Sequence, residues 1–198
     1  MADDEKKAIA DPGKGTRSRA RREPSGRVDP PGMTMDSNRV EAAQRGDLLA
    51  MNDLLDSLMP WVGRLCGSIA LDAGPDAAQE TLIQVMRDLK GLRDPASLRS
   101  WVRRIATREA IRHAERRRRE PLVDHLDRVP GFALDPGLRR DVACVLAELP
   151  PDQRAILVLR DLEGLSEAEA ALELNVAHGT IKSRLHRARE AFRKRWPA

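Results

Sequence analysis

Apolar positions recur at helical spacing along most of the chain, and no stretch alternates between apolar and polar residues as a strand would. The pattern begins at Asn38 and continues almost to the end. Pro60 interrupts the first long run, which resumes at Trp61. The members of that run are Leu48, Met51, Leu55, Leu58, Trp61, Leu65 and Ile69. The sequence therefore predicts an all-α protein.

The later apolar stripes predict helices over residues 76–90, 96–119, 138–149 and 152–163. Within the helix at 96–119 the inward side carries Leu98, Trp101, Val102, Ile105, Ala106 and Ala110. Residues 91–95 form a loop. Residues 120–137 contain three Pro, two Gly and several acids, which is typical of a linker. Residues 1–37 show no periodicity and a mixed charged, Gly- and Pro-rich composition, which indicates a disordered tail.

These boundaries divide the chain into two small helical domains, at 38–119 and 138–198, joined by a flexible linker. The second domain ends in a predicted helix-turn-helix at residues 165–196. Ser166 and Glu169 have the spacing of a capping box, and Leu165, Ala168, Ala171 and Leu172 recur at helical spacing. Asn175 falls where the first helix must end, and Asn tolerates the left-handed conformation common there.

The second helix of this motif has an apolar stripe of Ile181, Leu185, Ala188 and Phe192. Its other surface is strongly basic, with Glu190 as the one acid. Short residues near its start, Gly179, Thr180 and Ser183, allow a close backbone approach to a partner. A helix in the DNA major groove has these properties. The alternative is a solvated basic face, but the capped helix and short turn before it favour DNA.

A second basic surface is predicted along residues 96–119, which carry nine arginines. Arginine suits phosphate contacts because its guanidinium donates through a planar fork. The outer face of this helix carries Arg99, Arg103, Arg104, Arg108, Arg112 and the run from 116 to 119, against Glu109, Glu115 and Glu120. On the helix before it, Asp76, Gln79 and Glu80 project from the first turns. Acids there favour the helix dipole, and the cluster is also a plausible protein-docking patch.

Composition narrows the function classes. The 198 residues carry a net charge of +4, with 41% hydrophobic and 33% charged residues. The absence of Tyr and the scarcity of Trp and Phe disfavour stacking platforms for RNA. Cys66 and Cys144 are expected to be buried thiols in a reducing compartment. No signal-peptide core or long apolar run occurs, so we expect a soluble cytoplasmic protein without membrane insertion.

No pattern in the sequence indicates an enzyme. There is no Ser/His/Asp order, no glycine-rich phosphate loop and no carboxylate pair with a partner base. The four His residues lack metal-ligand spacing. We expect no enzyme activity, no metal and no cofactor.

Two segments resemble a known family. LPPDQRAILVLRDLEGLSEAEAALELNVAHGTIKSRLHRAREAFRKRW is similar to region 4 of bacterial RNA polymerase sigma factors of the extracytoplasmic-function (ECF) group. DAAQETLIQVMRDLKGLRDPASLRSWVRRIA resembles region 2 of the same group. Together they cover about residues 45–196 in the family's order. Ala177 departs from the pattern, because the family often has a capping Ser there.

The resemblance implies roles for individual residues. Recognition of the −35 element is implied for His178, Thr180, Lys182, Ser183, Arg184 and Arg187. Recognition and melting of the −10 element are implied for the loop at 92–97, with Ser97, and for Arg99, Trp101, Arg103, Arg104, Arg108 and Arg112. Docking on the largest polymerase subunit is implied for Asp76, Gln79 and Glu80. The implied partners are core RNA polymerase, promoter DNA and an anti-sigma factor.

The resemblance thus implies a sigma factor that binds core polymerase and directs promoter recognition and transcription initiation. The alternative is a stand-alone helix-turn-helix regulator that uses only the C-terminal domain. That alternative assigns no purpose to the arginine-rich helix or to the patch at Asp76 and Glu80.

Overall fold

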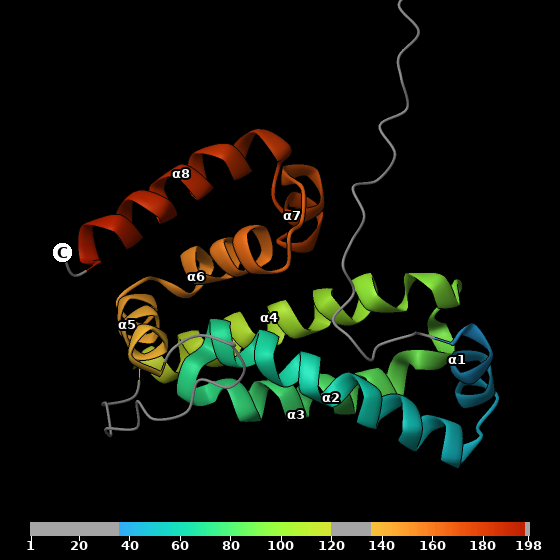
Figure 1. Ribbon diagram of the computed structural model, residues 1–198. Coiled ribbons are helices and arrows are strands. Elements are labelled where there is room, and N and C mark those ends of the chain that lie inside the picture. Colours follow the sequence, from blue (N-terminus) through green and yellow to red (C-terminus); the bar gives the residue numbers. More distant parts are fainter. Residues whose placement is uncertain (1–35, 120–135, 197–198) are drawn as a thin grey trace, which may run out of the picture.

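The computed structural model describes residues 36–119 and 136–196, and both ranges are helical with no strand (Figure 1). The all-α prediction is confirmed for these residues. The first range holds α1 (Ser37–Gln44), α2 (Leu48–Ala70), α3 (Gly74–Asp88) and α4 (Leu98–Arg119). The second holds α5 (Pro136–Ala147), α6 (Pro151–Leu157), α7 (Glu167–Glu173) and α8 (His178–Arg195). Short 3₁₀ turns lie at Leu71–Ala73, Leu89–Gly91 and Pro95–Ser97, and a π turn at Val158–Leu162.

The N-terminal domain is a bundle of α2, α3 and α4, with α1 against one end (Figure 1). Its core is built from fully buried side chains of all four helices, among them Val40, Leu58, Ile69, Val85 and Val102. Helices α2 and α3 come very close at Gly74, where a Cβ would lie 2.6 Å from the Cα of Gly67. Burial of these stripes away from water is what holds the bundle together.

The long helix α2 corrects one prediction, because it runs through Pro60 without interruption. Proline there removes the N–H that would bond to the carbonyl of Asp56. Both residues lie on the exposed side, where water can satisfy that carbonyl. Leu58, Trp61 and Val62 are buried on the other side. Packing of these side chains therefore outweighs the lost backbone bond.

In the C-terminal domain α8 packs against α6 and α7, with α5 beside the end of α8. Leu159, Leu165, Ile181 and Ala188 are buried at its centre. The predicted stripe on α8 is confirmed. The predicted inward face of α7 is partly wrong, because Ala168 and Leu172 are exposed while Ala170 and Ala171 are buried.

The two domains pack against each other, as α6 lies along α2 and α4 (Figure 1). Ala155 and Val158 of the C-terminal domain are buried within the N-terminal core. Leu174 packs against both cores, and Leu71 of the N-terminal domain packs against the C-terminal one.

Two predicted segments lie largely outside the described residues. They are the tail at 1–37 and the linker at 120–137. Within the described ranges, no helix is long and apolar enough to cross a membrane.

Candidate nucleic-acid interface

The helix-turn-helix has the local geometry that its sequence predicts. The Ser166 hydroxyl accepts a bond from the Glu169 N–H at 3.2 Å, and the Glu169 carboxylate accepts from the Ser166 N–H at 2.9 Å. Both halves of the capping box are therefore present. Asn175 has a φ of 50°, in the left-handed region, as expected. Ala177, the N-cap of α8, makes no side-chain cap bond.

Helix α8 presents its basic face to solvent. The buried stripe of Ile181, Leu185 and Ala188 fixes the rotation of the helix on the domain. The residues predicted for −35 recognition then lie on its outer surface: His178, Lys182, Ser183 and Arg187 are exposed, and Thr180 and Arg184 are half-buried. At Gly179 a Cβ would meet no atom within 4 Å, so the start of the helix is open to a close partner.

An ion pair joins α8 to the π turn that follows α6. Arg189 donates to Asp161, with its Nε 3.3 Å from Oδ2. This hydrogen bond raises the pKa of Arg189. Both side chains are about half exposed, and a surface pair of this kind adds little stability. The ion pair instead fixes the direction of the Arg189 side chain, which turns toward the protein.

The arginines of α4 fall into two groups. Arg104, Arg108 and Arg112 are exposed. Arg103, expected on the outer face, is instead buried with 2% of its side chain accessible, and Arg99 is 20% accessible. Glu109, also expected outside, is buried. Its carboxylate accepts from Arg112 Nε at 2.7 Å and lies 3.6 Å from Arg108 Nε. Arg108 and Arg112 are thus held in place by an acid beneath them.

The loop before α4 is anchored by Gln44, a residue that no sequence motif marks. The Gln44 side chain of α1 donates to the carbonyls of Leu89 at 2.9 Å and Leu92 at 2.7 Å. Asp94 caps the following turn by accepting from the Ala96 N–H at 3.0 Å. Ser97 is half-buried at the end of this loop. No short-range pattern points to Gln44, because its partners lie more than 40 residues away.

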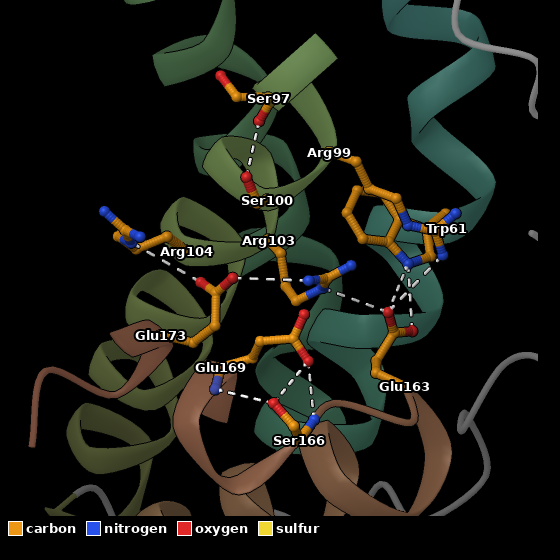
Figure 2. A network of polar contacts seen from close by, with 10 residues as sticks. All are labelled: Trp61, Ser97, Arg99, Ser100, Arg103, Arg104, Glu163, Ser166, Glu169 and Glu173. Atoms are coloured by element: carbon orange, nitrogen blue, oxygen red, sulfur yellow. Dashed lines mark hydrogen bonds and ion pairs between the residues drawn. The ribbon is translucent and has the colours of Figure 1, made fainter. Parts of the chain in front are cut away.

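Trp101 is half-buried and packs against the N-terminal core, as its spacing predicts. A different tryptophan, Trp61 of α2, lies beside the buried arginines (Figure 2). The guanidinium carbons of Arg99 and Arg103 lie 5.1 and 5.9 Å from its ring centroid. Cations at these distances over an indole are attracted to the ring.

Two acids of the C-terminal domain meet this group across the domain contact (Figure 2). Glu163 accepts from Trp61 Nε1 at 3.1 Å and lies 3.5 Å from Arg103 Nε. Glu173 lies 3.5 Å from Arg103 Nη1 and 3.8 Å from Arg104 Nε. Neither acid belongs to a sequence motif, because each is defined only by partners far away along the chain. The buried Arg103 therefore has a carboxylate on each side.

The predicted docking patch lies on the outer surface of α3. Asp76 and Gln79 are exposed and Glu80 is half-buried. Asp76 falls in the first turn, so its charge also favours the helix dipole. The structure thus places all three where a protein partner can reach them.

The two thiols differ in environment. Burial raises the pKa of Cys66 to about 12, with a smaller opposing effect from its hydrogen bond to Thr81. Cys144 is exposed, so the expectation that both thiols are buried is wrong for Cys144. It lies on the outer side of α5, whose inward side holds Ala143, Val145 and Leu146. No group of three or more His, Cys, Asp or Glu in the described ranges is arranged to hold a metal ion.

Comparison with known proteins finds a sigma-70 family match in each domain. The family described as "Sigma-70 region 2" matches residues 54–120, and "Sigma-70, region 4" matches residues 139–192. The first match covers most of α2 and all of α3 and α4, and the second covers α6, α7 and most of α5 and α8.

Among curated relatives, the "ECF RNA polymerase sigma factor SigE" of Mycolicibacterium smegmatis is 38% identical over 128 residues, which is 60% of this chain. That match spans about half of the relative, 49% of its length. The "ECF RNA polymerase sigma-E factor" of Escherichia coli K12 is 30% identical over 171 residues, covering 77% of this chain and 90% of the relative.

Two solved structures share the fold. One is CnrH in complex with the cytosolic domain of CnrY, with a TM-score of 0.58, 21% identity, and coverage of 81% of this chain and 96% of that one. The other is the sigma factor RpoE with the anti-sigma factor NepR from Bartonella quintana, with a TM-score of 0.55, 24% identity, and coverage of 73% and 94%.

Proposed function

This chain belongs to the ECF RNA polymerase sigma factors, and from that premise we propose how its two domains divide the work of transcription initiation. The observation that carries the function is the presence of regions 2 and 4 in one chain, in the family's order. A stand-alone helix-turn-helix regulator would need only the second. As a sigma factor the chain is a recognition subunit without catalysis of its own, and it acts with core polymerase on promoter DNA.

We propose that α8 recognises the −35 element. Lys182 and Ser183 lie exposed near the start of the helix, where a recognition helix contacts bases, and Arg187 lies one turn further on. His178, Thr180 and Arg184 complete the surface. Because Ala177 makes no side-chain cap bond, the start of α8 has room for a phosphate, which helix N-termini bind well.

For α4 and the loop before it we propose recognition and opening of the −10 element. Arg104, Arg108 and Arg112 are exposed cations that can contact a strand backbone while the two domains stay packed together. Trp101 packs inward, and we assign it the orientation of the loop ending at Ser97. Arg99 and Arg103 join this surface only if the C-terminal domain moves away from them.

Asp76, Gln79 and Glu80 are proposed to dock core polymerase. Their support is the exposure of Asp76 and Gln79, with Glu80 half-buried beside them on α3, together with the resemblance to the family's docking helix. An anti-sigma factor is a further proposed partner, since RpoE of Bartonella quintana was solved with the anti-sigma factor NepR. We also place the chain in the cytoplasm, where polymerase and promoters are found.

Run-off transcription tests the function. Purified chain and core polymerase are combined on the DNA upstream of the chain's own gene, and a specific transcript is expected.

Lys182→Ala and Arg184→Ala should each lower promoter affinity by about 1–3 kcal/mol if the residue contacts a base. The matched control is Lys194→Ala, at the exposed far end of the same helix. If the variant with both Lys182→Ala and Arg184→Ala binds the promoter as tightly as the wild type, α8 does not contact the −35 element.

A further inference from the structure

The loop between α3 and α4 is held to the N-terminal bundle at both of its ends. Leu89 at its start and Leu98 at its end are buried in the core. Between them the chain turns outward, and Arg93, Asp94 and Ala96 are exposed. The hydrogen bond that caps the second turn, from the Ala96 N–H to Asp94, stays within the loop. The direction of the exposed residues therefore depends on what holds the middle of the loop.

Gln44 of α1 holds the middle of the loop from outside. Its side-chain amide donates to the carbonyl of Leu89 at 2.9 Å and to the carbonyl of Leu92 at 2.7 Å. These two carbonyls lie at the two ends of one tight turn, in which the Leu92 N–H also bonds to the Leu89 carbonyl at 3.0 Å. An amide NH₂ group has two hydrogens to donate, and a bond to each carbonyl matches that number. Because rotation of the peptide group after Leu92 would break the shorter bond, this bond fixes the direction in which the chain enters its exposed part.

Helix α1 is itself a fixed support for the Gln44 side chain. Val40, one turn before Gln44, is 1% exposed and Ala43 is fully buried, and both pack in the N-terminal core. The turn after α1 contains Gly46, whose φ of 97° suits glycine and whose N–H bonds to the Ala43 carbonyl at 3.0 Å. Figure 1 shows α1 beside the start of α4. Packing of α1 on the core therefore sets the position of Gln44, and Gln44 sets the position of the loop.

We propose that Gln44 is a positioning residue for −10 recognition, and that its two hydrogen bonds hold the loop at 92–97 in the arrangement that fits the preferred bases. This inference rests on the proposed role of that loop. Gln44 carries no charge, so its replacement by an uncharged residue should leave the salt dependence of DNA binding unchanged. Base discrimination is a difference between two affinities, and a loop that is loosely held contacts preferred and other bases more equally. Loss of the bonds should therefore lower discrimination.

The test compares Gln44→Met with a matched control on the same helix. Methionine has nearly the length and shape of glutamine but no hydrogen-bond donor. The control is Asn38→Met, which also replaces an amide by methionine, at an exposed position of α1. Gln44→Lys is a second variant, because the lysine side chain is long enough and keeps donors for both carbonyls.

Circular dichroism and urea denaturation check that the variants fold. If Gln44→Met does not fold, Gln44→Glu takes its place, because ionised glutamate keeps the shape of glutamine and has no donor.

Run-off transcription with core polymerase measures the discrimination. The template is the DNA upstream of the chain's own gene, with single-base substitutions placed one at a time in the −10 and −35 regions. In Gln44→Met the ratio of transcription from the original and the substituted −10 templates should fall about two- to tenfold, the factor that one net hydrogen-bond contribution corresponds to. The same ratio for −35 substitutions should not change, since α8 lies in the other domain. Asn38→Met and Gln44→Lys should match the wild type in both regions.

Each of the other outcomes overturns the inference. Equal −10 discrimination in Gln44→Met and the wild type would show that the bonds of Gln44 do not position the loop for bases. An equal loss at −10 and −35 would show general damage to the chain. A loss in Gln44→Lys as large as that in Gln44→Met would show that donation to the two carbonyls is not what matters.

The wild type tests the proposed function separately. If it transcribes the original template and shows no base preference in the −10 region, the loop at 92–97 does not recognise the −10 element, and the role of Gln44 fails with it. If the wild type discriminates and Gln44→Met discriminates equally, only the role of Gln44 fails.

Discussion

The uncapped start of α8 leads to a specific prediction, that Ala177→Ser stabilises the free protein. Ala177 already has the extended backbone of an N-cap, with φ −61° and ψ 138°, and is exposed. Ser166 shows the same arrangement in this domain with its cap in place, with φ −68° and ψ 162°. A serine hydroxyl at position 177 would accept from the Gly179 or Thr180 N–H, which should contribute about 1 kcal/mol, in the range 0.5–2.

Urea denaturation followed by circular dichroism measures the effect. With a denaturant slope of about 1–3 kcal/mol per molar, a gain of 1 kcal/mol moves the midpoint upward by roughly 0.3–1 M. Ala168→Ser is the matched control, because Ala168 is exposed inside a helix that is already capped. That change should cost about 0.5 kcal/mol, the lower helix propensity of Ser. If Ala177→Ser gives no gain over the wild type, α8 does not begin at His178 in solution.

Three further predictions concern other parts of the chain. Replacing Asp76 and Glu80 by Lys should change the free energy of unfolding by less than about 0.5 kcal/mol. The same change should sharply lower the affinity for core polymerase. If holoenzyme still assembles normally, these acids only stabilise the start of the helix. In the native protein, a thiol reagent at pH 8 should modify Cys144 and spare Cys66 until unfolding. Because burial raises the pKa of Cys66 from 9.0 to about 12, its contribution to stability should be present below pH 9 and lost as pH rises from 9 to 12, and rapid native labelling of two thiols would contradict its burial. Arg154 is buried, and desolvation lowers its pKa to about 10, so its charge is disfavoured in the folded state. Arg154→Leu should therefore raise the melting temperature, with a net gain of about 1–2 kcal/mol after the loss of its bond to a backbone carbonyl, and a lower melting temperature would refute this.

The sequence by itself determined the features that depend on neighbours within a few residues. The capping box of Ser166 and Glu169, the left-handed Asn175 and the apolar stripe of α8 all follow from short-range chemistry and helical periodicity. The all-α fold follows for the same reason. The two family motifs could also be recognised in the sequence, because each is a contiguous pattern of residues.

The tertiary structure decided which of several locally equivalent residues are buried. Pro60 continues a helix because the side chains around it pack into a core. Arg103 and Arg108 have the same character in the sequence, yet Arg103 is buried between Glu163 and Glu173 and Arg108 faces solvent. Those partners lie 60 or more residues away along the chain. Burial and ion pairing are properties of surfaces brought together by folding, so no local pattern separates the two arginines.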